Sequence, residues 1–440
     1  MRNRNPFPLI LSVALAWLGF AMISTAQAPH TTYAIRGGKV YTLAGPPLED
    51  ATVLIRDGKI AAVGRDVSVP ADAQVIDAKG LQVYPGIFDS VTQAGLEEVP
   101  AVSATVDTVE LGLFDPDIVA ADGVHPESEH IPVIRAAGIT HVLTVPGIGG
   151  FGAARNVIGG QASAINLSGW TLQQMLIQKS VAMVVNWPTL ETRSFSFETF
   201  SMTERPFSEV RREYQKRVDT LADWIERARH YAEAEQKAPG TFTPDLKLAA
   251  LAPVVEGKLP LLVLADKARD IRHAVEFCSQ HKLRMILAGG EEAYKVEDLL
   301  KKNNIPVVFG STLESPPNED DPYDLLRAEP GRLAAAGIEV ALASFNTSFS
   351  RRLPQYAGVA AAYGLPWEEA VKAITITPAR IFGLDKQLGT LEAGKMANVI
   401  VTTGDPLELN TQVRYLFIDG SETSLDNKQL ELYKKYKARP

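Results

Sequence analysis

The sequence has 440 residues, of which 46% are hydrophobic and 22% are charged, and its net charge is −8 at pH 7. This length predicts one large domain and a smaller one. The mild acidity argues against nucleic acid as a partner, because phosphate binding requires a clustered basic surface. Cys278 is the single cysteine, which excludes an intramolecular disulfide and a thiolate metal cluster. Its amphipathic surroundings predict a buried structural thiol.

Residues 1–28 predict a signal peptide. Arg2 and Arg4 supply the positive start, and residues 9–23 form an apolar stretch that is short for a membrane span. Small residues follow, with cleavage expected after Ala26 or Ala28. We therefore expect an exported protein, periplasmic or extracellular, that is soluble and free of the membrane once the signal is removed.

Short strands with tight turns are predicted near both ends of the chain. In residues 31–82, "AIRGGKVYTL", "ATVLIRDGKIAAVG" and "AQVIDAKGLQVYP" alternate β-branched and polar residues around DG and GG turns. In residues 386–425, "ANVIVTTGDP" and "VRYLFIDGSE" show the same pattern. Two β segments therefore flank a long middle.

The middle, residues 83–385, alternates short apolar runs with amphipathic helical patterns. The apolar runs after the first, which lies at 83–89, are "HVLTV", "AMVVNW", "LPLLVLA", "RMILAGG", "IPVVFG" and "EVALAS". This alternation is typical of parallel βα units. It favours a TIM (β/α)₈ barrel, with an open doubly wound sheet as the alternative α/β architecture.

Two end segments carry a resemblance to a known family. "VIDAKGLQVYPGIFD" resembles the entry into the barrel of the amidohydrolase superfamily, nearest its imidazolonepropionase-like and dipeptidase-like members, and "AVKAITITPARIFGLDKQLGTLEAGKMANVIVTTGDPLE" resembles the exit. The resemblance implies a TIM barrel over 83–385 beside a small composite β-sandwich built from 31–82 and 386–425. It also implies metal-assisted hydrolysis of a C–N bond in a cyclic amide or peptide-like substrate, with zinc or another divalent metal.

The positions that match the family's metal ligands hold other residue types. Asp89 is kept, but the matching strand ends hold Val91, Gln93, Leu264, Asp266, Ala288, Gly289, Phe345 and Asn346. The segment that would supply a bridging lysine holds Asn166. His141 begins a strand, which places it at the N-terminal face of the barrel, opposite the face used for catalysis. We therefore expect no metal centre and no other cofactor.

Two further patterns could indicate a binding or catalytic site. Gly147, Gly149 and Gly152 form G-x-G-x-x-G, but no helical pattern and no suitably spaced acid follow. A glycine-rich loop at the barrel mouth is the better interpretation, with backbone N–H groups that could hold an anion. Asp89 and Asp266 are weak catalytic candidates for metal-free acid–base hydrolysis. Their alternative roles are a hydrogen bond to nearby backbone for Asp89 and a helix N-cap for Asp266.

These observations lead to two hypotheses. The first is a catalytically degenerate family member that acts by binding, as partner of a metal-complete relative or as a dimer with itself. Its small-molecule ligand would enter a mouth lined by Val91, Gln93, Gly147, Gly149, Asn166, Asp266, Gly289, Phe345 and Asn346. The second is a divergent hydrolase of C–N bonds that is metal-free or holds a hard cation through Asp89, Gln93, Asp266 and Asn346.

Overall fold

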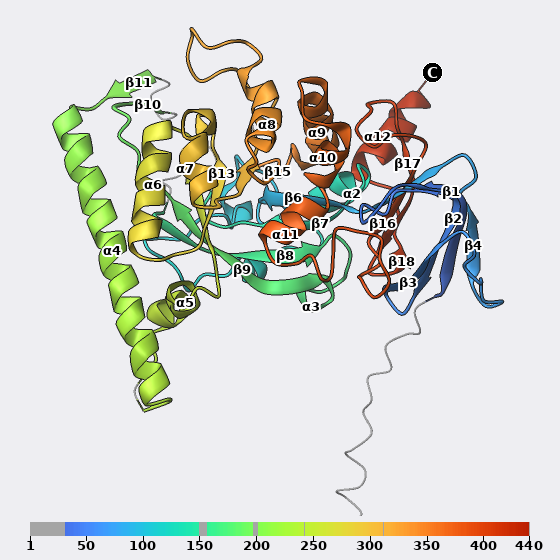
Figure 1. Cartoon of the computed structure of the whole chain (residues 1–440), viewed down its shortest axis with the longest axis horizontal. Coiled ribbons are helices and arrows are strands. Elements are labelled where there is room, and N and C mark those ends of the chain that lie inside the picture. Colours follow the sequence, from blue (N-terminus) through green and yellow to red (C-terminus); the bar gives the residue numbers. More distant parts are fainter. Residues whose placement is uncertain (1–30, 149–155, 197–200, 242, 311, 440) are drawn as a thin grey trace, which may run out of the picture.

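The computed structural model describes residues 31–439, apart from 149–155, 197–200, 242 and 311. The expected signal peptide lies outside the described residues, so it stays a prediction. Within the described residues, no helix is both long enough and apolar enough to cross a membrane. Two β-sheets organise the chain, a large one surrounded by helices and a smaller body formed where the two ends of the chain meet (Figure 1).

Strands from both ends of the chain share the smaller sheet. Its hydrogen-bonding order is β18-β17-β16-β5-β1-β2-β3, with β4 beside β1. The strands are β1 (Tyr33–Val40), β2 (Leu48–Arg56), β3 (Lys59–Gly64), β4 (Gln74–Asp77), β5 (Gln82–Pro85), β16 (Val399–Thr402), β17 (Val413–Ile418) and β18 (Ser421–Glu422). Asp57 and Gly58 turn the β2–β3 hairpin with φ angles of 51° and 75°, as the DG signal predicts. All eight strands hydrogen-bond into one sheet, and the expected sandwich stays a prediction.

The other sheet forms the barrel. It also has eight strands, and they curve into a nearly closed barrel. They are β6 (Ile87–Thr92), β7 (Ile139–Thr144), β8 (Ile158–Asn166), β9 (Leu176–Asn186), β12 (Leu261–Ala265), β13 (Met285–Gly289), β14 (Val307–Phe309) and β15 (Val340–Leu342). Each apolar run quoted above contributes one of these strands. A hairpin of β10 (Arg193–Ser196) and β11 (Ser201–Glu204) follows β9.

Helices cover the outside of the barrel sheet (Figure 1). The long α4 (Phe207–Lys237) packs against α5 (Leu246–Val255). The others are α2 (His130–Arg135), α3 (Leu172–Met175), α6 (Ala268–Gln280), α7 (Glu297–Lys302), α8 (Leu325–Ala335), α9 (Leu353–Ala362), α10 (Trp367–Lys372), α11 (Ile376–Ile381) and α12 (Lys428–Lys437). Cys278 is buried on α6, as expected, and burial raises the pKa of its thiol to about 12.

One barrel strand runs against the expected direction. β8 pairs antiparallel with both β7 and β9, so the uniform (β/α)₈ pattern is wrong here. The connection from β8 to β9 holds only the single turn α3. Because a parallel connection needs a crossover of about a dozen or more residues, this short link forces a reversal.

The reversal of β8 moves Asn166 away from the barrel mouth. Asn166 ends β8 opposite His141 near the start of β7, so both lie at the N-terminal end of the barrel. The Asn398 amide donates to Asn166 Oδ1 at 2.8 Å and lies 3.2 Å from His141 Nδ1. Burial lowers the pKa of His141 to about 3. The predicted place of His141 is therefore confirmed, and that of Asn166 is wrong.

The barrel closes between β15 and β6 without a regular ladder. The chain between α10 and α11 lies in this seam, because Leu342 N donates to Ala373 O and Phe88 N donates to Ile374 O. Nearer the C-terminal ends of the strands, Phe345 N donates to Val91 O at 2.8 Å. The buried side chain of Asp89 adds further hydrogen bonds across the seam.

Asp89 bonds across the seam with both of its carboxylate oxygens. Oδ1 accepts from Ser344 N at 2.9 Å, and Oδ2 accepts from Ser344 Oγ and Ser350 Oγ, each at 2.5 Å. The side chain is fully buried. Burial raises the pKa of Asp89 to about 6, although the serine hydrogen bonds act in the opposite direction. A backbone hydrogen bond from Val91 also lowers the pKa, so the expected contact with nearby backbone is present beside the long-range bonds.

We expect Asp89→Asn to remove a pH dependence of stability. Because the folded pKa is raised from 3.8 to about 6, protonated Asp89 favours the fold below pH 4, and this contribution is lost as pH rises through 6. Relative to the variant, the wild type should lose up to about 3 kcal/mol of unfolding free energy between pH 4 and pH 7. Urea unfolding at a series of pH values measures the difference.

His141 is present in both the wild type and Asp89→Asn. Its own titration therefore cancels from the difference between their unfolding free energies. Asp320→Asn, on an exposed loop, serves as the control and should leave the pH profile unchanged. A constant difference between wild type and Asp89→Asn over this range would contradict the burial of a titrating Asp89.

Candidate functional site

The floor of the barrel mouth is apolar where the family resemblance implies metal ligands. Val91, Leu264 and Ala288 belong to one buried cluster inside the barrel, and Phe345 packs against it. The exposed fractions of Val91, Leu264 and Ala288 are 0%, 9% and 1%. The strand-end positions therefore do converge inside the barrel. They bring together hydrocarbon side chains, which have no lone pair to offer a metal ion.

Phe345 is held over this floor by an unusual backbone. Its φ is +54°, a conformation that is strained for a bulky residue. A Cβ added at Gly310 would lie only 2.3 Å from Phe345 Cδ2, so glycine leaves the room that the ring needs. The neighbouring Asn346 accepts from Phe349 N at 3.1 Å and stabilises the turn after β15.

The remaining mouth residues on the β6 and β7 side are used by local contacts. Gln93 is buried and its Nε2 donates to Ile148 O at 2.5 Å. Gly147 N donates to Thr108 O at 2.6 Å, and a Cβ at Gly147 would lie 2.5 Å from Gly159 Cα. Close backbone packing thus explains Gly147, and its N–H is already bonded. Gly149 lies outside the described residues.

A cavity of about 560 Å³ opens at the mouth beside the ends of β9 and β12, a size typical of small-molecule sites. Its lining includes Asn186, Trp187, Thr189, Arg217, Asp266, Lys267 and Asp270. Of the two weak catalytic candidates, Asp266 alone lines this cavity, whereas Asp89 is sealed in the seam. The structure therefore does not bring the two carboxylates into one arrangement.

We expected Asp266 to cap α6, but the structure shows a different N-cap. The N-cap of α6 is Lys267, with no side-chain capping bond, and Ala268 N donates instead to Glu292 Oε2 at 2.9 Å. Asp266 Oδ1 accepts from Gly290 N at 3.1 Å. A Cβ at Gly289, where φ is +92°, would lie 2.3 Å from Asp266 Oδ1, so glycine makes room for the carboxylate.

Asn186 places a buried acceptor at this cavity, and no sequence motif predicted it. Its Nδ2 donates to Gly147 O at 2.8 Å and to Asn156 O at 2.7 Å. Two carbonyl acceptors fix the orientation of the amide. Its Oδ1 is buried and has no hydrogen-bond partner among the described residues. An unsatisfied buried acceptor is costly, so a ligand N–H would be favourable there.

The charged side chains of the cavity carry both signs. Asp270 accepts from Thr189 Oγ1 at 3.0 Å, and Arg217 pairs with Glu213 at 2.5 Å. Lys267 lies 3.8 Å from Glu292, a loose contact that leaves its ammonium near the opening. The arrangement can hold a small polar molecule that carries an N–H group.

The donors at the matching positions do not fit the family's divalent metal. Asp89 already accepts three hydrogen bonds, and the other converging side chains are apolar. Over the described part of the chain, no three His, Cys, Asp or Glu side chains gather as a metal site would require.

Comparisons with known proteins agree with this architecture. Residues 334–424 match the sequence model of the Amidohydrolase family. The chain is 23% identical to the amidohydrolase tasK of Hapsidospora irregularis, over 94% of this chain and 43% of that protein. The chain thus spans less than half the length of this relative.

Two further relatives match over most of their own length. The imidazolonepropionase of Symbiobacterium thermophilum is 25% identical, over 83% of this chain and 89% of that protein. The crystal structure of an amidohydrolase from Thermotoga maritima MSB8 superposes with a TM-score of 0.77 at 25% identity, covering 89% of this chain and 99% of that one. The barrel, the shared end sheet and these matches together show that the chain belongs to the amidohydrolase superfamily.

Proposed function

We propose that this chain is a catalytically degenerate amidohydrolase that acts by binding. The observation that carries the proposal is the buried apolar cluster of Val91, Leu264 and Ala288, against which Phe345 packs. Since these are the positions at which the family resemblance implies metal ligands, the barrel mouth lacks the donors for metal-assisted hydrolysis. No cofactor is proposed.

The mouth cavity is the proposed binding site. Asn186 Oδ1 supplies a buried acceptor, and Lys267 and Asp266 supply one charge of each sign. A small polar molecule with an N–H donor matches these groups. Phe345 and the apolar floor exclude such a ligand from the barrel interior, so it would rest above the strand ends.

A divergent hydrolase of C–N bonds is the competing function, and the place of Asp266 in the mouth cavity favours it. Asp89 does not support it, because a fully buried carboxylate that accepts three hydrogen bonds cannot reach a substrate. A hard cation would also need Gln93 and Asn346, yet both make the local hydrogen bonds described above.

We expect the purified chain, dialysed against zinc or manganese, to retain far less than one equivalent of metal. We also expect no hydrolysis of lactams or dipeptides, with or without chelator. Elemental analysis and an amine-release assay measure the two outcomes. Stoichiometric metal, or activity that Asp266→Asn abolishes and Asp320→Asn preserves, would overturn the degenerate assignment in favour of the hydrolase.

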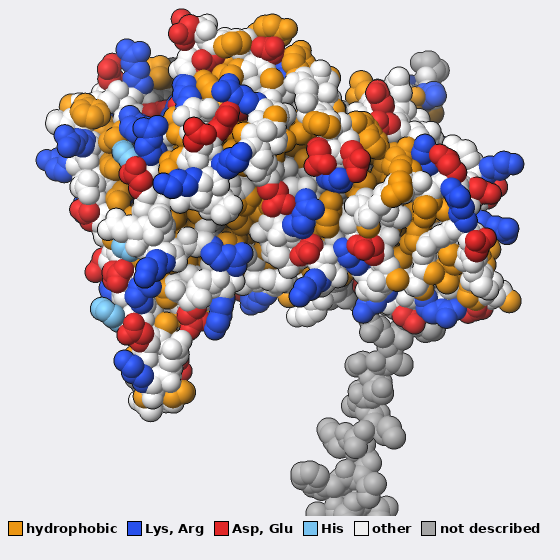
Figure 2. Space-filling model, viewed as in Figure 1, with side chains coloured by type: hydrophobic (Ala, Val, Ile, Leu, Met, Phe, Trp, Pro, Cys, Tyr) orange, Lys and Arg blue, Asp and Glu red, His pale blue; other side chains and the backbone are white. Residues whose placement is uncertain are grey.

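Exposed apolar side chains around the mouth support a partner. Leu111, Met202, Phe207 and Leu313 are 97%, 62%, 54% and 42% exposed, and all lie on segments that follow the C-terminal ends of barrel strands. Figure 2 shows hydrophobic side chains along the upper edge, over the segment before α8. We propose that a metal-complete relative, or a second copy of this chain, covers the mouth.

Replacing the rim residues Leu111 and Phe207 by serine should weaken this association by about tenfold or more, because each exposes apolar area that the partner would bury. Sedimentation of the chain alone and mixed with a metal-complete relative measures it. Leu409→Ser is the matched control, since Leu409 is 79% exposed but lies between β16 and β17. A chain that is monomeric in both experiments would refute the partner role.

Export is part of the same proposal. Residues 1–28 would be removed as a signal peptide, leaving a mature chain outside the cytoplasm. N-terminal sequencing of the protein purified from its native host should begin after Ala26 or Ala28, and a first residue of Met1 would contradict export.

A further inference from the structure

A second and larger cavity lies at the opposite end of the barrel. It has a volume of about 640 Å³ and is lined by residues at the starts of β12 to β15 and at the ends of α6, α7 and α11. These are the N-terminal ends of the strands, so the cavity is separated from the mouth by the apolar barrel interior. Its volume falls in the usual range for small-molecule pockets.

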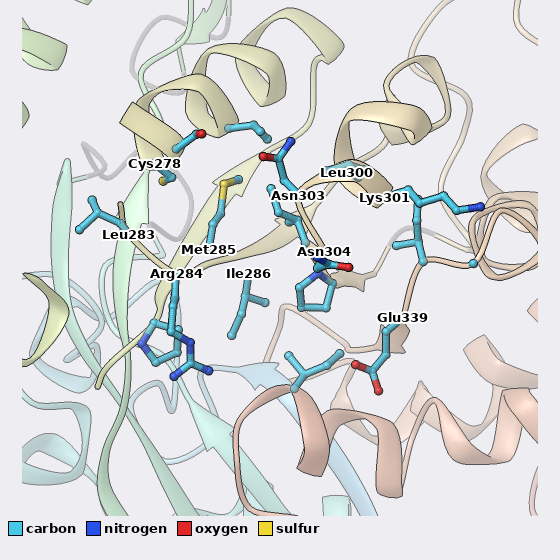
Figure 3. Close-up of a pocket in the computed structure, with 18 of the residues that line it drawn as sticks. Cys278, Leu283, Arg284, Met285, Ile286, Leu300, Lys301, Asn303, Asn304 and Glu339 are labelled. Atoms are coloured by element: carbon cyan, nitrogen blue, oxygen red, sulfur yellow. The ribbon is translucent and has the colours of Figure 1, made fainter. Parts of the chain in front are cut away.

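The deep wall of this cavity is apolar. Leu283, Met285, Ile286 and Ile338 line it, and each is less than 9% exposed. Figure 3 shows Met285 and Ile286 between the labelled polar residues at the edges of the opening. Backbone groups at the strand starts are already paired, as in Leu287 N to Pro306 O and Val307 N to Glu339 O. The cavity therefore offers a ligand apolar surface, with polar groups at the rim.

The rim carries an excess of positive charge. Arg380 pairs with Glu339 at 2.9 Å, which neutralises both. Arg284 makes one hydrogen bond, to Gly257 O at 3.3 Å. Lys301 also lines the cavity, and among the described residues neither Arg284 nor Lys301 has a carboxylate within ion-pair distance. The whole chain has a net charge of −8. The two cations without acid partners therefore give the rim of this cavity a charge opposite to that of the whole chain.

Arginine suits one ligand chemistry in particular. Its planar guanidinium presents five N–H donors, which match the two oxygens of a carboxylate. The apolar wall beside Arg284 matches a hydrocarbon or aromatic body. We propose that this N-terminal cavity binds a small organic carboxylate, with Arg284 as the carboxylate partner and the body against Met285 and Ile286. This site does not depend on the function proposed for the mouth.

The probe is 1-naphthylacetate, and its neutral amide, 1-naphthylacetamide, is the ligand-side control. Calorimetric titration of the full chain should show saturable binding of the acid and binding at least about tenfold weaker for the amide, equivalent to about 1.4 kcal/mol. Arg284→Gln should weaken binding of the acid by a similar factor and leave that of the amide unchanged.

Two variants keep the test specific. Lys282→Gln removes the same charge two residues away, outside the cavity lining, and should change affinity less than about twofold. Ser279→Trp places a large ring at the exposed side of the cavity and should block both ligands; thermal melting of each variant verifies folding.

The proposal fails if the wild type shows no saturable binding of the acid. It also fails if acid and amide bind equally, or if Arg284→Gln and Lys282→Gln behave alike. Loss of binding with Asp266→Asn instead of Arg284→Gln would assign the ligand to the mouth and overturn the N-terminal site.

Discussion

The barrel of this protein depends on a buried carboxylate that joins its first and last strands. Asp89 on β6 accepts hydrogen bonds from Ser344 and Ser350, which follow β15. No regular ladder closes this seam, so the carboxylate and a few backbone bonds define how the strand ends meet. Burying the charge is costly, as the raised pKa of about 6 shows, and three donors offset part of that cost. Asp89 therefore links the two edges of the barrel sheet.

The closure also sets the position of the mouth residues. Ser344 is followed by Phe345, whose N–H donates to Val91 O and whose ring packs on the apolar cluster. The same turn thus seals the seam and covers the floor. Polar groups remain at the side of the mouth, where Asn186, Asp266 and Lys267 line the cavity. The polar cavity and the apolar floor beside it therefore follow from one local arrangement.

The strands of this fold could be predicted from sequence because apolar runs and DG turns are local signals. β8 was missed, since "IGGQASAIN" is rich in small residues and its direction depends on the short link to β9. Asn166 was misplaced for the same reason. Likewise the cap of α6 comes from Glu292, 24 residues beyond Ala268, and Asp89 bonds to residues 255 and 261 positions away. Such long-range partners have no signature in a local pattern.

The apolar side chains at the strand ends have an energetic consequence for the fold. A metal centre gathers buried polar groups that are stable only when the metal satisfies them. Val91 and Leu264 instead bury apolar area, and each such side chain contributes about 1.5–3 kcal/mol when fully buried. This burial stabilises the barrel interior, which lies between the cavities at its two ends. A barrel of this kind has concave sites at both ends, and the apolar side chains at its strand ends pack the interior between them.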